Sequence, residues 1–134
     1  MSGLVLKLNP RERILVNGAV IVNCDRRASL CIVTPDAHIL RLRDAISPQD
    51  VNTPVKRVCY VAQLALSGDA NESEAKQQVL RGIEQLSQVM RDNDSRAHLT
   101  LATTALIGND FYRALKSLRN LLPREARLLA HDLS

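Results

Sequence analysis

Arginine is the residue type with the clearest chemistry in the first half of this sequence. Its planar guanidinium group can bind a phosphate through two parallel hydrogen bonds and can stack on a nucleobase. Up to residue 58 the chain carries nine lysine and arginine residues against five acidic ones, and the remainder carries nine of each. We therefore expect the N-terminal part to present a surface that binds polyanions. The candidate residues, chosen for charge and predicted face, are Arg11, Arg13, Arg26, Arg27, Arg41, Arg43, Lys56 and Arg57.

The scarcity of aromatic residues limits how such a surface could bind RNA. The chain has two tyrosines, one phenylalanine and no tryptophan. An RNA-recognition motif needs paired rings on its sheet, so that mode is excluded. Binding would instead use phosphate contacts, arginine stacking and backbone groups at strand edges, and it should weaken steeply with salt.

Other chemically active residue types form no recognisable site in the sequence. No metal site or cofactor is expected, because the histidines lie on different predicted elements without paired ligand spacing. They are His38, His98 and His131. The spacing of Cys24, Cys31 and Cys59 matches no metal or redox motif, so we expect free thiols in a reducing compartment. A glycine-rich phosphate loop is absent from the sequence. A Cys–His pair that meets only in space stays open, but we do not expect an enzyme.

A predicted β-hairpin over residues 13–22 lies at the centre of the basic region. Asn17-Gly18 separates two β-prone runs, and a type I′ turn requires positive φ at both of these positions. Arg11 and Arg13 precede the turn, and Arg26 and Arg27 follow the second run. An ordinary hairpin with solvated charges at its ends remains the alternative explanation.

Short alternating runs predict five strands, over residues 4–8, 13–16, 19–22, 28–33 and 38–43. In the first strand Leu4, Leu6 and Leu8 share one face. In the last, Leu40 and Leu42 point inward, whereas Arg41 and Arg43 point outward. Tight turns between the strands indicate a small antiparallel sheet or partial barrel.

Helical periodicity takes over after residue 47. Ser47–Asp50 is predicted as a single turn, and Thr53 as the cap of a helix over residues 54–67. Further helices are predicted over residues 72–91, 96–107 and 111–122, with a last short helix over 124–133. The fold class is therefore α+β, a β subdomain (1–46) followed by a bundle of four to five helices (47–134), together forming one compact unit. Neither a signal peptide nor a membrane-spanning run is evident, so we expect a cytoplasmic protein.

Several motifs, in order, resemble the flagellar biosynthesis repressor FlbT family. They are Glu12-Arg13-Ile14, Val16-Asn17-Gly18-Ala19-Val20-Ile21, Asp25-Arg26-Arg27, Leu40-Arg41, Thr53-Pro54, and Arg57, Tyr60 and Gln63. The match spans roughly residues 4–66 and continues loosely through the helical part. Two positions depart from the family pattern: Arg11 replaces a glycine, and Cys59-Tyr60 replaces an aromatic pair.

The resemblance implies post-transcriptional control of flagellin. Members of the family associate with the 5′ untranslated region of flagellin mRNA and repress translation or promote mRNA decay, and in some bacteria they act positively instead. A flagellin-linked protein, FlaF, usually works with them. The resemblance assigns no RNA-contacting residue to this chain.

Two alternatives follow from the sequence. The protein could be an interaction module, an adaptor or co-chaperone acting with FlaF and flagellin, whose effect on mRNA is indirect. Exposed leucines such as Leu118, Leu121 and Leu122 would then dock a partner helix, although packing in the core is the more common explanation of such a stripe. The pattern of short basic strands is also similar to that of the carbon storage regulator, which suggests a homodimer formed through edge strands.

Overall fold

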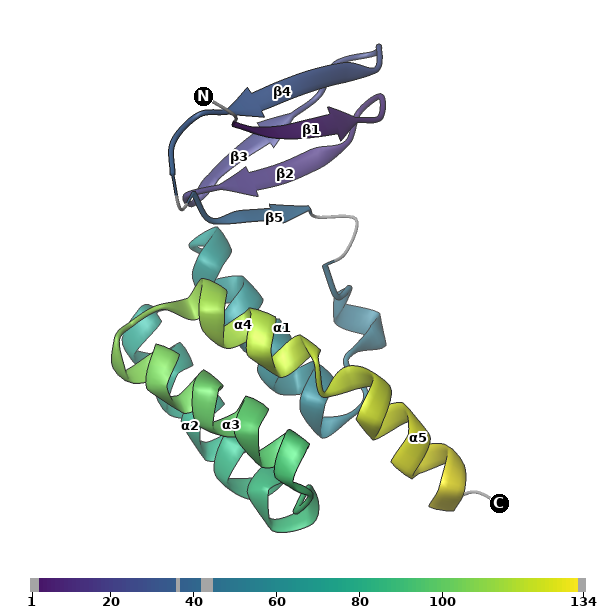
Figure 1. Cartoon of the computed structure of the whole chain (residues 1–134), viewed down its shortest axis with the longest axis vertical. Coiled ribbons are helices and arrows are strands. Elements are labelled where there is room, and N and C mark those ends of the chain that lie inside the picture. The colour runs from purple at the N-terminus through teal and green to yellow at the C-terminus, as the bar shows by residue number, and fades with distance from the viewer. Residues whose placement is uncertain (1–2, 36, 42–44, 133–134) are drawn as a thin grey trace. The chain divides into compact units, whose positions relative to one another are not determined.

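The computed structural model describes residues 3–35, 37–41 and 45–132. Strands come first and helices follow, which confirms the predicted α+β class (Figure 1). The chain divides into two compact units, Met1–Ala45 and Ile46–Ser134, called here the β unit and the helical unit.

The described strands of the β unit are antiparallel, as we predicted, and they divide into two small sheets. The strands are β1 (Leu4–Leu8), β2 (Arg13–Val16), β3 (Ala19–Val22), β4 (Ala28–Ile32) and β5 (Ile39–Arg41). β1 pairs with β4, and β2 pairs with both β3 and β5. The local hairpin is as predicted, but the pairing of β1 with β4 joins segments that are distant in sequence.

The turn between β2 and β3 has the predicted conformation. Asn17 has φ of 49° and Gly18 has φ of 86°, as a type I′ turn requires. The Asn17 side chain also accepts a hydrogen bond from the His38 backbone N–H at 2.9 Å. The turn therefore fixes the register of the hairpin and contacts the segment that leads into β5.

An aliphatic core fills the β unit. Leu6, Leu8 and Ile14 are buried, and partly buried neighbours pack against them. Those neighbours are Val16, Leu30, Ile32 and Ile39. Leu4 was predicted on the same buried face as Leu6 and Leu8, but 54% of it is exposed. It lies at the start of β1, opposite Ile32 of β4.

Capping residues define the helices of the helical unit. They are α1 (Pro54–Ser67), α2 (Glu72–Val89), α3 (Asn93–Ile107), α4 (Phe111–Arg119) and α5 (Leu122–Asp132), preceded by a 3₁₀ turn, Pro48–Asp50. Thr53 caps α1 as predicted, and α1 stops at Gly68, which has φ of 80°. α3 begins earlier than predicted, because Asp92 accepts a hydrogen bond from the Ser95 N–H and caps the helix. We predicted that Pro123 separates two helices, but it lies in the first turn of α5. Proline is tolerated there, because the backbone N–H that it lacks would have no partner within the helix.

The core of the helical unit uses the leucines that we had considered for docking. Leu118 and Leu121 are fully buried and Leu122 is half-buried, so these leucines pack in the core, which was the more common explanation of their spacing, and the docking alternative loses its exposed surface. α1 and α2 pack closely because residue 82 is glycine. A Cβ atom at Gly82 would lie 2.2 Å from Cγ1 of Val58.

A buried carboxylate joins the last helix to the first. Glu125 of α5 accepts a hydrogen bond from the Val55 N–H at 2.9 Å and another from the Thr53 hydroxyl. The Val55 N–H belongs to the first turn of α1, where backbone donors have no partner within the helix. Glu125 therefore supplies from α5 an acceptor that α1 lacks.

Candidate nucleic-acid interface

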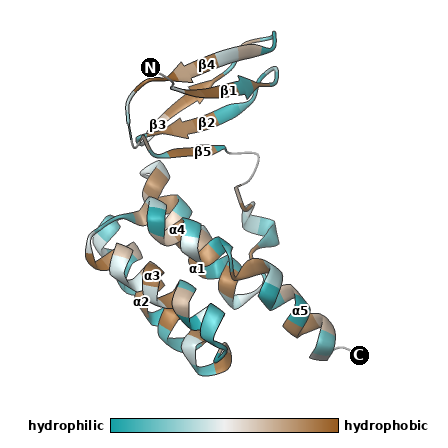
Figure 2. Cartoon of the chain, viewed as in Figure 1, coloured by the Kyte–Doolittle hydropathy of each residue, from teal (hydrophilic) through white to brown (hydrophobic). Residues whose placement is uncertain are grey.

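The basic residues of the β unit gather at one end of its strands (Figure 1). Antiparallel pairing places Leu8 opposite Ala28 and Arg13 opposite Val22, so β1 and β3 end where β4 and β2 begin. The turns between β1 and β2 and between β3 and β4 lie at this end, and Figure 2 shows them as hydrophilic. We call it the basic end; its described basic residues are Lys7, Arg11, Arg13, Arg26, Arg27 and Arg41.

Hydrogen bonds hold the two turns of the basic end together. The Asn23 side-chain amide donates to the backbone carbonyls of Asn9 and Arg26, at 2.8 Å each. The Arg11 N–H donates to the Cys24 carbonyl at 2.9 Å, and Arg11 itself has φ of 61°. The arginines of these turns therefore extend from a fixed backbone. Sequence reasoning missed Asn23, whose place in a predicted turn was the available signal.

Arg41 forms a bidentate ion pair within the unit. Its Nε and Nη2 donate to the two carboxylate oxygens of Glu12 at 2.8 and 3.0 Å, and Nη2 also donates to the Lys7 carbonyl. Glu12 is 9% exposed and also accepts from the Asn9 N–H at 3.0 Å. Planar, bidentate pairs of this kind are strong and directional. Arg41 was chosen from the sequence for RNA binding, but in the structure its guanidinium group neutralises Glu12 and joins β5 to the β1–β2 turn.

Arg11 is paired more loosely. Its guanidinium group lies 3.1 Å from an Asp25 carboxylate oxygen, and both side chains are 81% exposed. An ion pair this exposed contributes about 0–1 kcal/mol, so a phosphate could replace the Asp25 carboxylate at little cost.

Four cations of the basic end carry no acceptor of their own. Lys7, Arg13, Arg26 and Arg27 are exposed, and their side chains form no hydrogen bond or ion pair with any residue that the structure describes. Lys7 and Arg27 line a hollow of about 370 Å³ together with Asn9 and Ser29, where β1 ends and β4 begins. Ammonium and guanidinium groups beside amide and hydroxyl groups suit a phosphate. Lys7 was not among the RNA-binding candidates chosen from the sequence, because that choice favoured arginine residues.

The other candidates are not among the described residues of the β unit. Arg43 lies outside the described residues. Lys56 and Arg57 belong to the first turn of α1 in the helical unit, where the Lys56 ammonium group donates to the Asn52 side chain at 3.3 Å. The sequence predicted one set of basic residues, but the structure divides that set between its two units.

The described residues offer neither a metal-binding cluster nor a membrane-spanning helix, and the three cysteines are free thiols. Residues 3–35, 37–41 and 45–132 contain no group of three or more potential metal ligands and no helix long and apolar enough to cross a membrane. Cys24 and Cys31 are exposed, whereas Cys59 is buried. Burial raises the pKa of the Cys59 thiol to about 12, so this thiol is a poor nucleophile.

Comparison with known proteins agrees with the resemblance found in the sequence. The family model described as "Flagellar protein FlbT" matches residues 4–129. A protein of Bradyrhizobium diazoefficiens, named probable flagellum biosynthesis repressor protein FlbT 1, is 35% identical over 93% of this chain and 84% of its own length. A probable flagellum biosynthesis repressor protein FlbT of Rhodopseudomonas palustris is 32% identical over 95% of this chain and 98% of its own. No solved structure matches. Because the family model covers nearly the whole chain, this protein belongs to the FlbT family of flagellar proteins.

Proposed function

We propose that this protein regulates flagellar synthesis by binding RNA through its basic end. The observation that carries the proposal is the group of four exposed cations without acceptors, Lys7, Arg13, Arg26 and Arg27, at one end of a small β unit. The names of the relatives, which describe a repressor of flagellum biosynthesis, support a regulatory role. The family resemblance supports the 5′ untranslated region of flagellin mRNA as the target, with repression of translation or promotion of mRNA decay as the outcome.

The chemistry of the β unit favours contacts with the RNA backbone. All three aromatic residues, Tyr60, Phe111 and Tyr112, lie in the helical unit. Within the β unit, base stacking would therefore use guanidinium planes such as those of Arg26 and Arg27. Each neutralised phosphate of a single strand contributes about 0.7 to the slope of log affinity against log salt concentration. Four phosphate contacts predict a slope of about −2.8 on the same principle.

The test is binding of the purified chain to fluorescein-labelled flagellin leader RNA from its own organism, between about 50 and 200 mM salt. A scrambled RNA of equal composition measures selectivity. The variant with Arg26→Ala and Arg27→Ala should lose about 1.4 from the salt slope. A matched control, Arg91→Ala with Arg96→Ala, removes the same charge from exposed positions of the helical unit and should keep the wild-type slope. Equal slopes for the two double variants would refute the basic end as the RNA-binding surface.

The direction of regulation needs a separate measurement in cells. A reporter fused to the flagellin leader would be compared in bacteria that lack the protein and in bacteria supplied with wild type or with Arg26→Ala/Arg27→Ala. We expect the wild type to lower reporter output and the double variant to do so less. A wild-type protein that raises the output would identify a positive regulator.

A further inference from the structure

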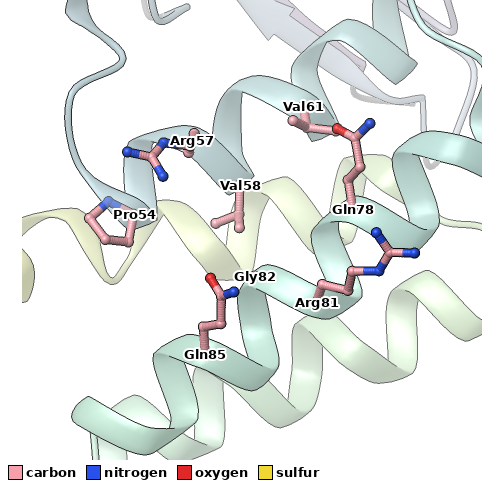
Figure 3. Close-up of a pocket in the computed structure, with 8 residues that line it drawn as sticks. All are labelled: Pro54, Arg57, Val58, Val61, Gln78, Arg81, Gly82 and Gln85. Atoms are coloured by element: carbon pink, nitrogen blue, oxygen red, sulfur yellow. The ribbon is translucent and has the colours of Figure 1, made fainter.

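A groove lies between α1 and α2 in the helical unit (Figure 3), whereas the residues assigned to RNA binding belong to the β unit. Its volume is about 300 Å³, at the small end of the range for ligand sites. Its principal lining residues are Arg57, Val58, Val61, Gln78, Arg81 and Gln85. The first three belong to α1 and the other three to α2, so the groove is contained within the helical unit.

The floor of the groove is aliphatic. Val58 is buried and Val61 half-buried, and Pro54 lies at the end of the groove where α1 begins. Gly82 contributes to the depth of the groove, because it has no side chain that would cover the Val58 methyl group. The floor contains no aromatic ring, so it suits an aliphatic side chain better than a nucleobase, which binds by stacking.

The rim of the groove is positive and polar. Arg57 on α1 and Arg81 on α2 are exposed, and within the described residues their guanidinium groups have no hydrogen-bond or ion partner. Gln78 and Gln85 are exposed on the same side of α2, one turn on either side of Arg81. Their amides can both donate to and accept from a peptide backbone. Carboxylate residues are absent from the lining of the groove.

We propose that this groove binds an acidic segment of a partner protein. One aliphatic side chain of the segment contacts Val58 and Val61, and carboxylates on either side of it bind Arg57 and Arg81. Charge complementarity carries the assignment: two guanidinium groups without acceptors flank an apolar floor, and guanidinium groups bind carboxylates in bidentate geometry. This site uses residues of the helical unit alone and adds an aliphatic floor, whereas the basic end uses residues of the β unit.

The test is selection of peptides from a phage library of random 12-residue sequences on the full-length chain. The variant Arg57→Glu/Arg81→Glu reverses the charge of the rim, and Arg96→Glu makes a charge reversal at an exposed position of α3 as the control. We expect the wild type and the control to enrich peptides in which Asp or Glu flanks Leu, Ile or Val. The double variant should lose this preference or select Lys and Arg instead.

Affinities of a synthetic peptide with the selected sequence make the comparison quantitative. By fluorescence anisotropy, Arg57→Glu/Arg81→Glu should bind it about tenfold more weakly or worse, since two attractions become repulsions. Val61→Ser should also weaken binding, and circular dichroism checks that each variant is folded. The absence of a consensus, a consensus without acidic residues, or an unchanged consensus on the double variant would overturn the proposal.

Two further arms separate this proposal from RNA binding. Arg26→Ala/Arg27→Ala should keep wild-type affinity for the peptide, which would show that the sites are independent. If the wild type selects no acidic peptide but Arg57→Glu/Arg81→Glu weakens leader RNA binding, the groove belongs to an RNA surface and the peptide proposal fails. If peptide binding persists while the leader RNA does not bind, only the proposed RNA function fails.

Discussion

Replacing Glu125 tests whether α5 stabilises the helical unit through the beginning of α1. Glu125 is 8% exposed and accepts hydrogen bonds from the Val55 N–H and the Thr53 hydroxyl. Hydrogen bonds to a charged acceptor contribute about 1.5–3 kcal/mol each, so two of them amount to about 3–6 kcal/mol, and the half-buried Thr53 hydroxyl can recover a part of its share by bonding to water. Glu125→Ala removes both bonds and leaves the Val55 N–H without its acceptor. We therefore expect a loss of about 3–5 kcal/mol in the free energy of unfolding.

Glu125→Gln separates the charge from the shape of the side chain. The glutamine oxygen can still accept from the Val55 N–H, and its amide can donate to the Thr53 hydroxyl oxygen, which already accepts from the Lys56 N–H. Both contacts survive without the negative charge at the start of a helix, so a loss of about 1–2 kcal/mol is expected. Glu84→Ala, at an exposed position of α2, is the control and should change stability by less than about 0.5 kcal/mol.

Tyrosine fluorescence during urea unfolding is a suitable assay, because both tyrosines lie in the helical unit and report on it alone. With a denaturant slope of about 2 kcal/mol/M, Glu125→Ala should lower the urea midpoint by roughly 1.5–2.5 M. A shift no larger than that of Glu84→Ala would refute the role assigned to the carboxylate.

The remaining predictions concern two glycines and the thiols. Gly18→Val should destabilise the β unit by about 1–3 kcal/mol, because a β-branched residue is strained at φ of 86°, even though no atom lies close to the new side chain. The loss would be measured as faster amide hydrogen exchange in β2 and β3. Gly82→Ala should lower the melting temperature, since the new methyl group would collide with Val58, and an unchanged value would contradict the close α1–α2 packing. Iodoacetamide at about pH 8 should modify Cys24 and Cys31 and spare Cys59 until urea is added, as mass spectrometry would show. Because the folded pKa of Cys59, about 12, lies above its ordinary value of 9.0, its contribution to stability is complete below pH 9 and declines as pH rises toward 12.

Local signals in the sequence predicted the elements well. Asn17-Gly18 fixed a turn whose geometry depends on those two residues, and Thr53-Pro54 fixed the start of α1. Ends of elements were predicted less well: Asp92 caps α3, although the segment 92–95 was expected to be a break. A cap and a turn use the same residue types, so composition does not distinguish them.

Contacts between distant segments could not be predicted. Nothing in the local pattern pairs β1 with β4, and this pairing divides the strands between two sheets. The acceptor for Arg41 is Glu12, which lies 29 residues earlier in the chain, so alternation identified the face of Arg41 but not its partner. From the sequence, the arginines could be assigned only to one face of a strand. The structure shows that strand pairing brings them to one end of the β unit, and that four of the cations there have no partner among the described residues.

The pairing of Glu12 with Arg41 has a consequence for how the sequence can change during evolution. The two residues form a bidentate ion pair in which the Glu12 side chain is 5% exposed, so losing Arg41 leaves a charge in a largely enclosed place. A substitution at one of the two positions should therefore be accompanied by a compensating substitution at the other. In a family alignment we expect positions 12 and 41 to covary as acid and base, or to become neutral together, whereas Arg26 and Arg27 should vary independently of any acidic position in the β unit.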